Sequence, residues 1–383
     1  MTKLGDNHIY RRLGVRPFIN AADSYTTIGG SRMPHEVLEA MRQAAEHFVE
    51  LDALHDRIGE EIARLTRNEA AMITSGAAAG IALCVAACVT GFDPSRKRSF
   101  PHLEQLKNEV IIHRCQRNGF DMAADVLGVH MIEVGDERAT YAEELEGAIG
   151  PKTACILYFD TSQYAKAAIP VEKAADIARK RGVPLIVDAA AQLPPVDNLW
   201  RYTELGADLV IFSGGKTLQG PQSSGFIVGK KELVRACRMH AGPAADAVGR
   251  PMKVGREEMA GLLAAIERYV KLDHAAVRNR HERVTEIFMK ELGSLGYKAE
   301  RAYPGPTGQD YAFAMFDMRG ASLTADDILR LMKDGEPAVL VALAREKENH
   351  FCLNPLHVAD EEIPVIIERF KQLGPIEYVS SEA

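Results

Sequence analysis

One lysine stands where it could bond covalently to a carbonyl group. Lys216 lies in the stretch DLVIFSGGKTLQGPQSSG at residues 208–225, directly after an apolar run and among glycines that leave little side chain around it. An amine that is desolvated beside other cations has a lowered pKa and can attack a carbonyl carbon. A solvated lysine in a turn is the alternative interpretation of the same residues.

A carboxylate also ends an apolar run. Asp188 follows Leu-Ile-Val in the segment PLIVDAAAQLPP. A carboxylate buried there needs a cation or a hydrogen-bond donor as a partner, which would lower its pKa and keep it ionised at neutral pH. The alternative is an aspartate that caps the next helix.

The segment TSGAAAG at residues 74–80 joins a predicted strand to a predicted helix. Its small residues let the backbone approach an anion, and the unpaired N–H groups at a helix start point toward it, helped by the helix dipole. This pattern fits a phosphate site. A simple strand-to-helix turn with Ser75 as the N-cap remains the alternative.

His113 follows another apolar run, in VIIHRCQRNGFD. A core or surface histidine is the alternative to a functional one, and Arg114, Gln116 and Arg117 in the same segment are competing candidates. Taken together, however, an anion loop, a strand-end aspartate and a strand-end lysine preceded by Ser213 follow the order that pyridoxal 5′-phosphate requires in a fold type I enzyme.

The elements that would position these residues alternate along the chain. Apolar runs predict strands at residues 70–75, 109–114, 129–135, 153–160, 183–190, 207–214 and 224–230, and helical patterns occupy residues 76–91, 141–150 and 170–182. Strands that are apolar on both faces and separated by helices indicate a mostly parallel sheet between two layers of helices. The short connection before the last strand permits an antiparallel pair. We therefore expect an α/β fold with a mostly parallel seven-stranded sheet.

Three regions follow from these patterns. Residues 1–55, which include a helix at 34–48, are expected to pack on a small domain or on a partner subunit. Residues 56–250 form the large domain that would bind the cofactor. Residues 251–383 form a linking helix and a smaller α+β domain, with one long helix at 255–296, strands at 311–318 and 351–355, and a last helix at 361–374.

Composition excludes several classes of protein. The 383 residues are 46% hydrophobic and 26% charged, as in an ordinary globular protein. No apolar run approaches the roughly 20 residues that cross a bilayer, and the first residues lack the apolar region of a signal peptide. The six cysteines show neither zinc spacing nor a disulfide-dense pattern, and Cys84 and Cys88 are expected to be reduced core residues. We therefore expect a cytoplasmic protein without a membrane partner, and the net charge of −7 argues against a nucleic-acid surface.

Several segments together resemble a known family. They are GVRPFINAA, TIGGSRM, SGAAAG, VDAAAQLPP, FSGGKTLQGPQSSG and GRPMKVGREE, which lie between about residues 13 and 265, and more faintly HFCLNPLHVAD at 350–360. The family is that related to selenocysteine synthase (L-seryl-tRNA selenium transferase). This chain looks most like its shorter D-glucosaminate-6-phosphate ammonia-lyase branch. The lysine segment FSGGK…GPQ is the most specific part of the resemblance.

The resemblance implies a fold type I enzyme with pyridoxal 5′-phosphate as its cofactor. It implies that Lys216 bonds to the cofactor and that Asp188 contacts the pyridine nitrogen. Ser75, Gly76, Ala77 and Ser213 would contact the phosphate. His113 would stack on the ring and serve as a general acid, with Gln116 as the competing stacking residue.

Further residues follow from the resemblance with less detail. Ser24, Tyr25, Thr27 and Arg32 are expected to contact the substrate, because the family's amino-terminal segment reaches into the active site. Arg250 and Lys253 are expected to add charge for binding an anion, across a dimer interface. Fold type I enzymes usually build their sites between two subunits, so we expect a homodimer or a larger homo-oligomer.

The expected reaction is α,β-elimination on a β-hydroxy amino acid or an amino sugar acid like D-glucosaminate-6-phosphate, giving a 2-oxo acid and ammonia. Racemisation, aldol cleavage and selenium transfer to seryl-tRNA remain alternatives, as does a non-catalytic scaffold with this fold. The bacterial tRNA-dependent transferases look longer, with an additional amino-terminal domain, whereas this sequence starts almost directly at the catalytic region. We therefore do not expect tRNA as the substrate.

Overall fold

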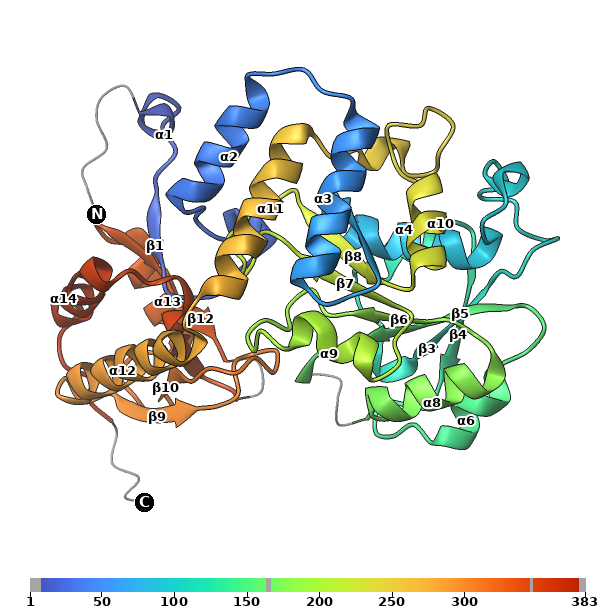
Figure 1. Cartoon of the computed structure of the whole chain (residues 1–383). Helices are drawn as coiled ribbons and strands as arrows, with labels where there is room; N and C mark the ends of the chain where they lie inside the picture. Colours follow the sequence, from blue (N-terminus) through green and yellow to red (C-terminus); the bar gives the residue numbers. More distant parts are fainter. Residues whose placement is uncertain (1–7, 163–166, 345–346, 379–383) are drawn as a thin grey trace. The chain divides into compact units, whose positions relative to one another are not determined.

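The computed structural model describes residues 8–162, 167–344 and 347–378 (Figure 1). The chain forms two compact units. The larger unit is Thr26–Leu272, and the smaller one combines Met1–Tyr25 with Asp273–Ala383. These boundaries differ from the expected ones at residues 55 and 250, because helices on both sides of the predicted boundaries pack together within the larger unit.

A seven-stranded sheet forms the centre of the larger unit. Its strands are β2 (Ala70–Thr74), β3 (Glu109–His113), β4 (His130–Val134), β5 (Thr153–Phe159), β6 (Leu185–Asp188), β7 (Leu209–Ser213) and β8 (Gly225–Gly229), in the spatial order β2-β8-β7-β6-β5-β3-β4. β8 runs antiparallel to both of its neighbours, and the other neighbouring pairs are parallel. The predicted α/β fold and the antiparallel strand are both confirmed.

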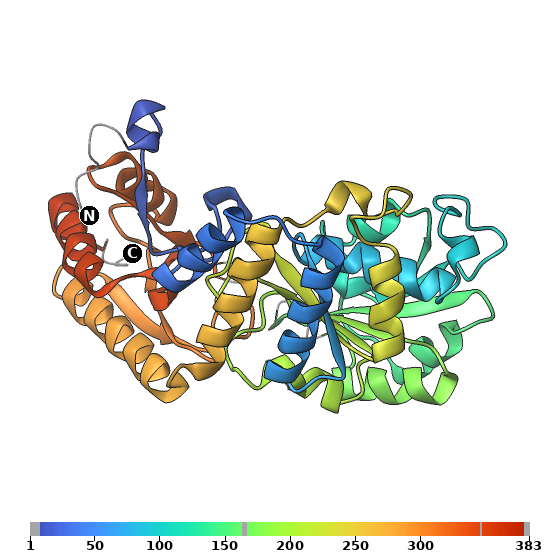
Figure 2. The same ribbon diagram turned by 45° about the horizontal axis from the view of Figure 1, so that its top comes forward.

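Helices cover both faces of this sheet, as Figure 2 shows from a second side. α4 (Ala77–Thr90), α5 (Met122–Asp125) and α10 (Lys231–Met239) share one core with residues such as Ile186 and Ile211. The helices α3 (Leu51–Leu65), α6 (Ala142–Ala148), α8 (Val171–Arg181), α9 (Asn198–Glu204) and α11 (Arg256–Lys271) share the other core with residues such as Leu185 and Val187. Alternate residues of β6 thus enter opposite cores, and each fully buried aliphatic side chain contributes about 1.5–3 kcal/mol. This two-sided burial explains why the inner strands are mostly apolar, whereas the edge strand β4 carries the exposed His130 and Glu133.

The helix α2 (His35–Ala45) packs against α11 in the larger unit. The approach is close, because a Cβ added at Gly261 of α11 would lie 2.7 Å from Cγ of Met41. Residues 34–55 therefore belong to the larger unit, whereas residues up to Tyr25 belong to the smaller one.

The expected long helix at 255–296 is two helices, α11 and α12 (His274–Gly293). Leu272 leaves the helical conformation, with ψ near 147°. Asp273 then caps α12 by accepting a hydrogen bond from the Ala276 N–H at 2.9 Å. The prediction of one helix was wrong because an N-cap interrupts the helix where the amphipathic pattern continues. The break coincides with the boundary between the two units.

The smaller unit is an α+β structure, as expected. A four-stranded antiparallel sheet has the order β12 (Ala342–Leu343), β13 (His350–Leu353), β10 (Phe313–Asp317), β9 (Lys298–Ala302). A second, parallel pair joins β1 (Phe18–Asn20) to β11 (Ala338–Leu340), and the helices are α1 (Ile9–Arg12), α12, α13 (Ala325–Asp334) and α14 (Ile363–Leu373). Stacked rings fill the core, with centroids 4.8 Å apart for Phe316 and Phe351 and 5.7 Å apart for Phe351 and Phe370.

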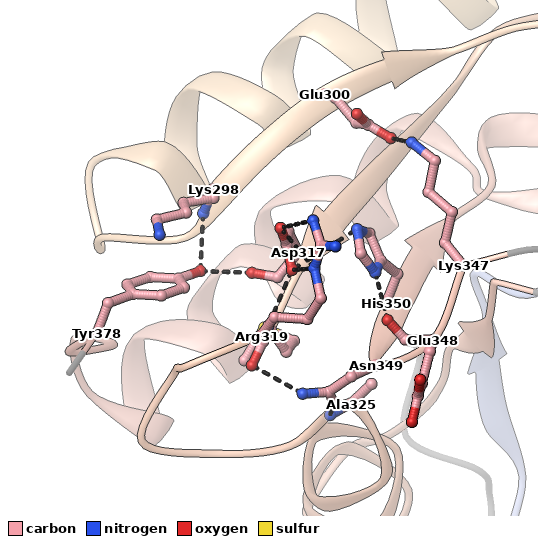
Figure 3. A network of polar contacts seen from close by, with 11 residues as sticks. Lys298, Glu300, Asp317, Arg319, Ala325, Lys347, Glu348, Asn349, His350 and Tyr378 are labelled. Carbon is pink, nitrogen blue, oxygen red and sulfur yellow. Dashed lines mark hydrogen bonds and ion pairs between the residues drawn. The ribbon is translucent and has the colours of Figure 1, made fainter. Parts of the chain in front are cut away.

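A polar network closes one edge of this smaller unit (Figure 3). The Tyr378 hydroxyl donates to the backbone oxygen of Asp317 at 2.6 Å. The guanidinium of Arg319 holds the pKa of the Asp317 carboxyl far below its usual range. Asn349 donates to the Met318 oxygen and accepts from the Ala325 N–H, both at 2.8 Å. These bonds satisfy the backbone where β10 ends and α13 begins, and we assign them a structural role.

Among the described residues, no helix combines the length and the apolar character needed to cross a bilayer. All six cysteines are free thiols.

Candidate active site

Three strand ends meet at one edge of the seven-stranded sheet. Gly225, which begins β8, pairs with Thr74 at the end of β2 on one side and with Ser213 at the end of β7 on the other. The next strand, β6, ends at Asp188, which pairs with Ile211 of β7. The turn after β2, the lysine segment after β7 and the aspartate of β6 therefore lie along the same edge, where ligands of open α/β sheets bind.

The turn after β2 leaves a helix start open to an anion. The N-cap of α4 is Gly76, with φ at 127°, and no side chain of the described residues caps this helix. Ser75 is therefore not the N-cap. The buried Thr74 hydroxyl holds the turn by donating to the Gly76 oxygen at 2.8 Å. A Cβ added at Gly76 would meet no atom of the described chain within 4 Å, so its outer side is open. Ala77 begins the helix with unbonded N–H groups that suit a phosphate.

The first residue of β8, Gly225, packs closely against this turn. A Cβ added at Gly225 would lie 2.8 Å from the Gly76 carbonyl carbon and 3.0 Å from the Ala77 nitrogen. We expect Gly225→Ala to displace the turn and weaken binding of pyridoxal 5′-phosphate about tenfold, since overpacking of this kind costs about 1–3 kcal/mol. Fluorescence titration of the full-length protein measures this affinity.

Gly229 provides the matched control at the other end of the same strand. A Cβ there would lie 2.1 Å from the Asp208 oxygen, far along β8 from the turn. Gly229→Ala should lower thermal stability and leave the affinity within about twofold of the original, because its clash does not reach the turn. Equal losses of affinity in the two variants would contradict an anion site at Gly76.

Asp188 is a buried carboxylate, 8% exposed. Burial raises its pKa, while the Ala190 N–H, which donates to Oδ1 at 2.8 Å, and the charge of Lys216 act in the opposite direction. The expected depressed pKa was wrong for the chain by itself, because one amide and one amine do not offset the loss of solvation. The charge of Lys216 nevertheless lowers the pKa of the Asp188 carboxyl, which indicates that the amine lies close enough to the carboxylate to interact with it electrostatically.

A tight loop carries Lys216. The Gly214 N–H donates to the Ser224 oxygen and the Gly220 N–H donates to the Gly214 oxygen, both at 2.9 Å. The Gln219 N–H donates to the Lys216 oxygen at 2.9 Å. The absence of side chains on the glycines is necessary, because a Cβ at Gly214 would lie 2.1 Å from the Ser224 hydroxyl. We call residues 214–224 the lysine loop.

His113 and Gln116 lie beside the end of β3 and are both fully buried. Neither ring nitrogen of His113 has a hydrogen-bond partner among the described residues, and the same is true of Gln116 Nε2. Burial lowers the pKa of His113 to about 4. The ring packs edge-on against Tyr158 with centroids 5.4 Å apart, and Gln116 Oε1 accepts from the Phe159 N–H at 3.1 Å. A histidine neutral at pH 7 is a poor proton donor, and its stacking role stays a prediction.

The half-buried Asp160 and the buried Tyr202 form a hydrogen-bonded pair next to this edge that the sequence did not reveal. The Asp160 N–H donates to the Asp188 backbone oxygen at 3.1 Å, and its carboxylate accepts a hydrogen bond from the Tyr202 hydroxyl. Burial raises the pKa of Asp160. The only signal in the sequence was one more aspartate directly after an apolar run, in ILYFD.

The residues expected to contact the substrate fall in both units. Ser24 and Tyr25 belong to the smaller unit, where the Ser24 hydroxyl shares a hydrogen bond with His357 Nε2. His357 was not among the predicted site residues, although it lies in the conspicuous segment HFCLNPLHVAD.

Thr27 and Arg32 belong to the larger unit and are exposed. The residues between them contact the lysine loop, since the Ser31 hydroxyl donates to the Gly215 oxygen at 3.0 Å. The exposed Arg250 begins a 3₁₀ turn of the same unit, η4 (Arg250–Met252), and the exposed Lys253 follows it. Their proposed role at a subunit interface stays a prediction.

A family model described as L-seryl-tRNA selenium transferase matches residues 121–304. A curated relative named D-glucosaminate-6-phosphate ammonia lyase, from Salmonella typhimurium (strain 14028s / SGSC 2262), is 33% identical over 96% of this chain and 98% of its own. The chain belongs to the selenocysteine synthase-related family. Within that family, a protein from Streptomyces sp named 5′-C-glycyluridine monooxygenase-decarboxylase is 30% identical over 95% of this chain and 91% of its own.

The transferases of the family are more distant. The L-seryl-tRNA(Sec) selenium transferase of Rhizobium meliloti (strain 1021) is 29% identical over 76% of this chain and 64% of its own. The solved structure of a D-glucosaminate-6-phosphate ammonia-lyase superposes with a TM-score of 0.83 at 31% identity, covering 97% of this chain and 98% of that one. A serine palmitoyltransferase from Sphingomonas wittichii, 15% identical with a TM-score of 0.60, shares the fold alone. The fold is that of fold type I enzymes.

Proposed function

We propose that this protein is a pyridoxal 5′-phosphate-dependent ammonia lyase. It removes the amino and β-hydroxyl groups from a β-hydroxy amino acid or an amino sugar acid, and it releases a 2-oxo acid and ammonia. One observation carries the proposal: the α4 start, Asp188 and Lys216 lie along a single edge of one sheet, in a chain 33% identical to an ammonia lyase over nearly its full length.

The residues along this edge fit the cofactor. The α4 start offers N–H groups and an open side at Gly76 for a phosphate. The buried carboxylate of Asp188 has a raised pKa and therefore favours a cationic partner, which a protonated pyridine nitrogen provides. The hydroxyl groups of Ser75 and Ser213 stand at the ends of β2 and β7, where they would donate to phosphate oxygens.

Each of these residues would have a distinct task. Pyridoxal 5′-phosphate, when bound, supplies an electron sink that stabilises negative charge at Cα of an amino acid. Lys216 Nζ would hold the cofactor covalently and, when free, would accept the Cα proton of the substrate. Asp188 would accept a hydrogen bond from the pyridine N–H and keep that proton in place. The N–H groups of Ala77 and its neighbours would hold the phosphate, so that the reacting bond would keep its orientation.

The proposed elimination needs no reagent other than the substrate and water. The Cα proton moves to Lys216 Nζ, the β-hydroxyl group leaves with a proton as water, and the released enamine takes up water to give the 2-oxo acid and ammonia. Lys216 would return its proton to the leaving hydroxyl. His113 is the predicted alternative donor, but a pKa of about 4 leaves its imidazole neutral at pH 7.

We infer an amino sugar acid with an anionic end as the favoured substrate, because the 33% identical relative is named for D-glucosaminate-6-phosphate. Ser24, Tyr25, Thr27 and Arg32 are the proposed substrate contacts. We also propose a homodimer, supported by exposed apolar side chains such as Phe48, 96% exposed, and Phe120, 65% exposed. A cytoplasmic location agrees with six free thiols. We propose that no nucleic acid takes part.

A substrate panel tests the proposed reaction. The full-length protein loaded with pyridoxal 5′-phosphate is assayed on both enantiomers of serine and threonine, and on D-glucosaminate with and without its 6-phosphate. We expect ammonia and a 2-oxo acid in equal amounts, fastest with the phosphorylated sugar acid. The unphosphorylated sugar acid is the matched control for recognition of the anion.

Other products would point to other reactions of the same fold. Interconversion of enantiomers without ammonia would identify a racemase, and release of glycine with an aldehyde would identify an aldolase. Carbon dioxide release with oxygen uptake would resemble the Streptomyces relative. A tRNA complex that persists at moderate salt would favour the selenium transferase alternative. Any of these results without ammonia release would overturn the lyase proposal.

A further inference from the structure

The segment just before α2 is tied to the lysine loop by contacts that the proposed chemistry does not explain. It consists of the 3₁₀ turn η1 (Thr26–Ile28) followed by Gly29, Gly30 and Ser31. We call residues 26–31 the strap. It lies within the larger unit, as does the whole lysine loop.

The backbone of the strap touches the backbone of the lysine loop. Gly30 has φ at +72°, and a Cβ added to it would lie 2.4 Å from the Gly215 oxygen. Gly215 itself has no room for a side chain, because its Cβ would lie 2.6 Å from Cα of Gln222. The backbone of Gly215 therefore lies directly against the backbone of Gly30 on one side and that of Gln222 on the other, with no room for a side chain at either contact. Both glycines are buried.

Two hydrogen bonds fasten the same contact. The Ser31 hydroxyl donates to the Gly215 oxygen at 3.0 Å, and this carbonyl belongs to the peptide unit that contains the Lys216 nitrogen. Gln222 Nε2 donates to the Thr26 oxygen at 2.8 Å. One bond therefore runs from the strap to the loop and the other from the loop to the strap, on either side of Gly30.

We propose that the strap positions Lys216, with Gly30 and Ser31 as positioning residues. The side chain of a lysine is long and flexible, so its amine is placed only as well as its own backbone is held. The contact at Gly215 holds the residue directly before Lys216. The strap also connects Thr27 to Arg32, so the proposed substrate contacts of this unit are fixed to the same loop. This proposal deepens the proposed function and rests on it for the role of Lys216.

The two neighbouring glycines allow a matched test. Gly29 and Gly30 both have positive φ, at +86° and +72°, so alanine strains the backbone at either position. Only Gly30 would bring its Cβ into a clash with the lysine loop, at 2.4 Å from the Gly215 oxygen, since a Cβ at Gly29 would make one ordinary van der Waals contact with that loop, at 3.7 Å from Gln222 Oε1. Ser31→Ala removes the hydroxyl alone, and Ser31→Thr keeps it.

Hydrogen exchange of the full-length protein reads the position of the loop independently of activity. The reporters are the bonded N–H groups of Gly214, Gln219 and Gly220. Relative to the unmodified protein, we expect Gly30→Ala to speed their exchange about tenfold and Ser31→Ala about fivefold. Gly29→Ala and Ser31→Thr should stay within about twofold. Equal effects of Gly29→Ala and Gly30→Ala, or no rescue by Ser31→Thr, would overturn the proposal.

A second measurement on the same proteins reports on the lysine. Pyridoxal 5′-phosphate is added, the bond to protein is fixed with borohydride at timed intervals, and the modified peptide is quantified by mass spectrometry. Gly30→Ala and Ser31→Ala should slow modification of Lys216, and Ser31→Thr should restore it. Rates unchanged by Gly30→Ala and Ser31→Ala would also overturn the proposal. If the unmodified protein never carries the cofactor on Lys216, the proposed function fails, whereas the exchange comparison still tests whether the strap holds the loop.

Discussion

Lys216→Ala is expected to abolish ammonia release, lowering kcat by at least about a thousandfold. Lys216 Nζ is assigned both the covalent bond to the cofactor and the movement of the Cα proton, and alanine can do neither. The visible absorbance of the lysine-bound cofactor should disappear as well. Ammonia release and absorbance of the purified, cofactor-loaded variant measure both effects.

Two controls separate this chemistry from loss of charge or of fold. Lys216→Arg keeps a cation near Asp188 but provides no nucleophile at neutral pH, so it should be as inactive as the alanine variant. Lys173→Ala changes an exposed lysine of α8 and should retain full activity. Turnover by Lys216→Ala above a tenth of the original rate would refute the assignment.

Asp188→Asn is expected to have opposite effects on activity and on stability. An amide does not hold a proton on the pyridine nitrogen as a carboxylate does, so kcat should fall by roughly 10²–10⁴-fold. Without cofactor, however, the ionised carboxyl of Asp188 is buried with only partial compensation, because burial raises its pKa. Asparagine removes that charge, so the cofactor-free variant should unfold at a higher urea concentration at pH 7 than the original protein.

The pH dependence follows from the direction of this shift. The pKa of Asp188 is higher in the folded chain than in the unfolded chain, where the pKa of an aspartate is about 3.9. The folded chain therefore binds more protons over the interval between the two values, and its stability falls as pH rises through that interval. Asp188→Asn should remove this decline, which urea unfolding at a series of pH values would show.

Asp208 is the matched control for a buried carboxylate, since it is also 8% exposed and accepts a hydrogen bond from the Leu185 N–H at 2.7 Å. It forms an ion pair with Lys230 at 2.5 Å, at the opposite end of β7 from the lysine loop. Asp208→Asn should therefore lower stability and leave kcat close to that of the original protein. If Asp188→Asn destabilised the cofactor-free chain as Asp208→Asn does, the account of Asp188 would be wrong.

The sequence predicted the central sheet well because its inner strands are buried on both faces, whereas the edge strand β4 is largely exposed or half-buried. The Leu-Ile-Val run of β6 is apolar and fully buried, and glycines cap the C-termini of α4 and α8 at Gly91 and Gly182. The short strands of the smaller unit were harder to predict. β9 (KAERA) is an edge strand of charged and small residues, and β12 has only two residues, so neither gives a clear apolar pattern. The break at Asp273 depends on one cap inside a continuous amphipathic segment.

Individual site residues were predictable because Asp188, Ser213 and Lys216 each follow an apolar run, and strand ends of a parallel sheet share an edge. The spatial order of the strands that carry them was not predictable, because β8 lies between β2 and β7 through pairing between residues far apart in the chain. The ionisation of Asp188 depends on burial and on the number of donors around it, which no local motif specifies. The strap had a signal in the glycine pair of TIGGS, but its contact with Gly215 joins residues far apart in the chain.

The most direct test of the account locates the cofactor on the wild-type chain. The full-length protein is incubated with pyridoxal 5′-phosphate, reduced with borohydride, digested and analysed by mass spectrometry. We predict one added pyridoxyl group per chain, on the peptide that contains Lys216. A protein that releases ammonia from its substrate while carrying the label on another lysine, or on none, would contradict the account.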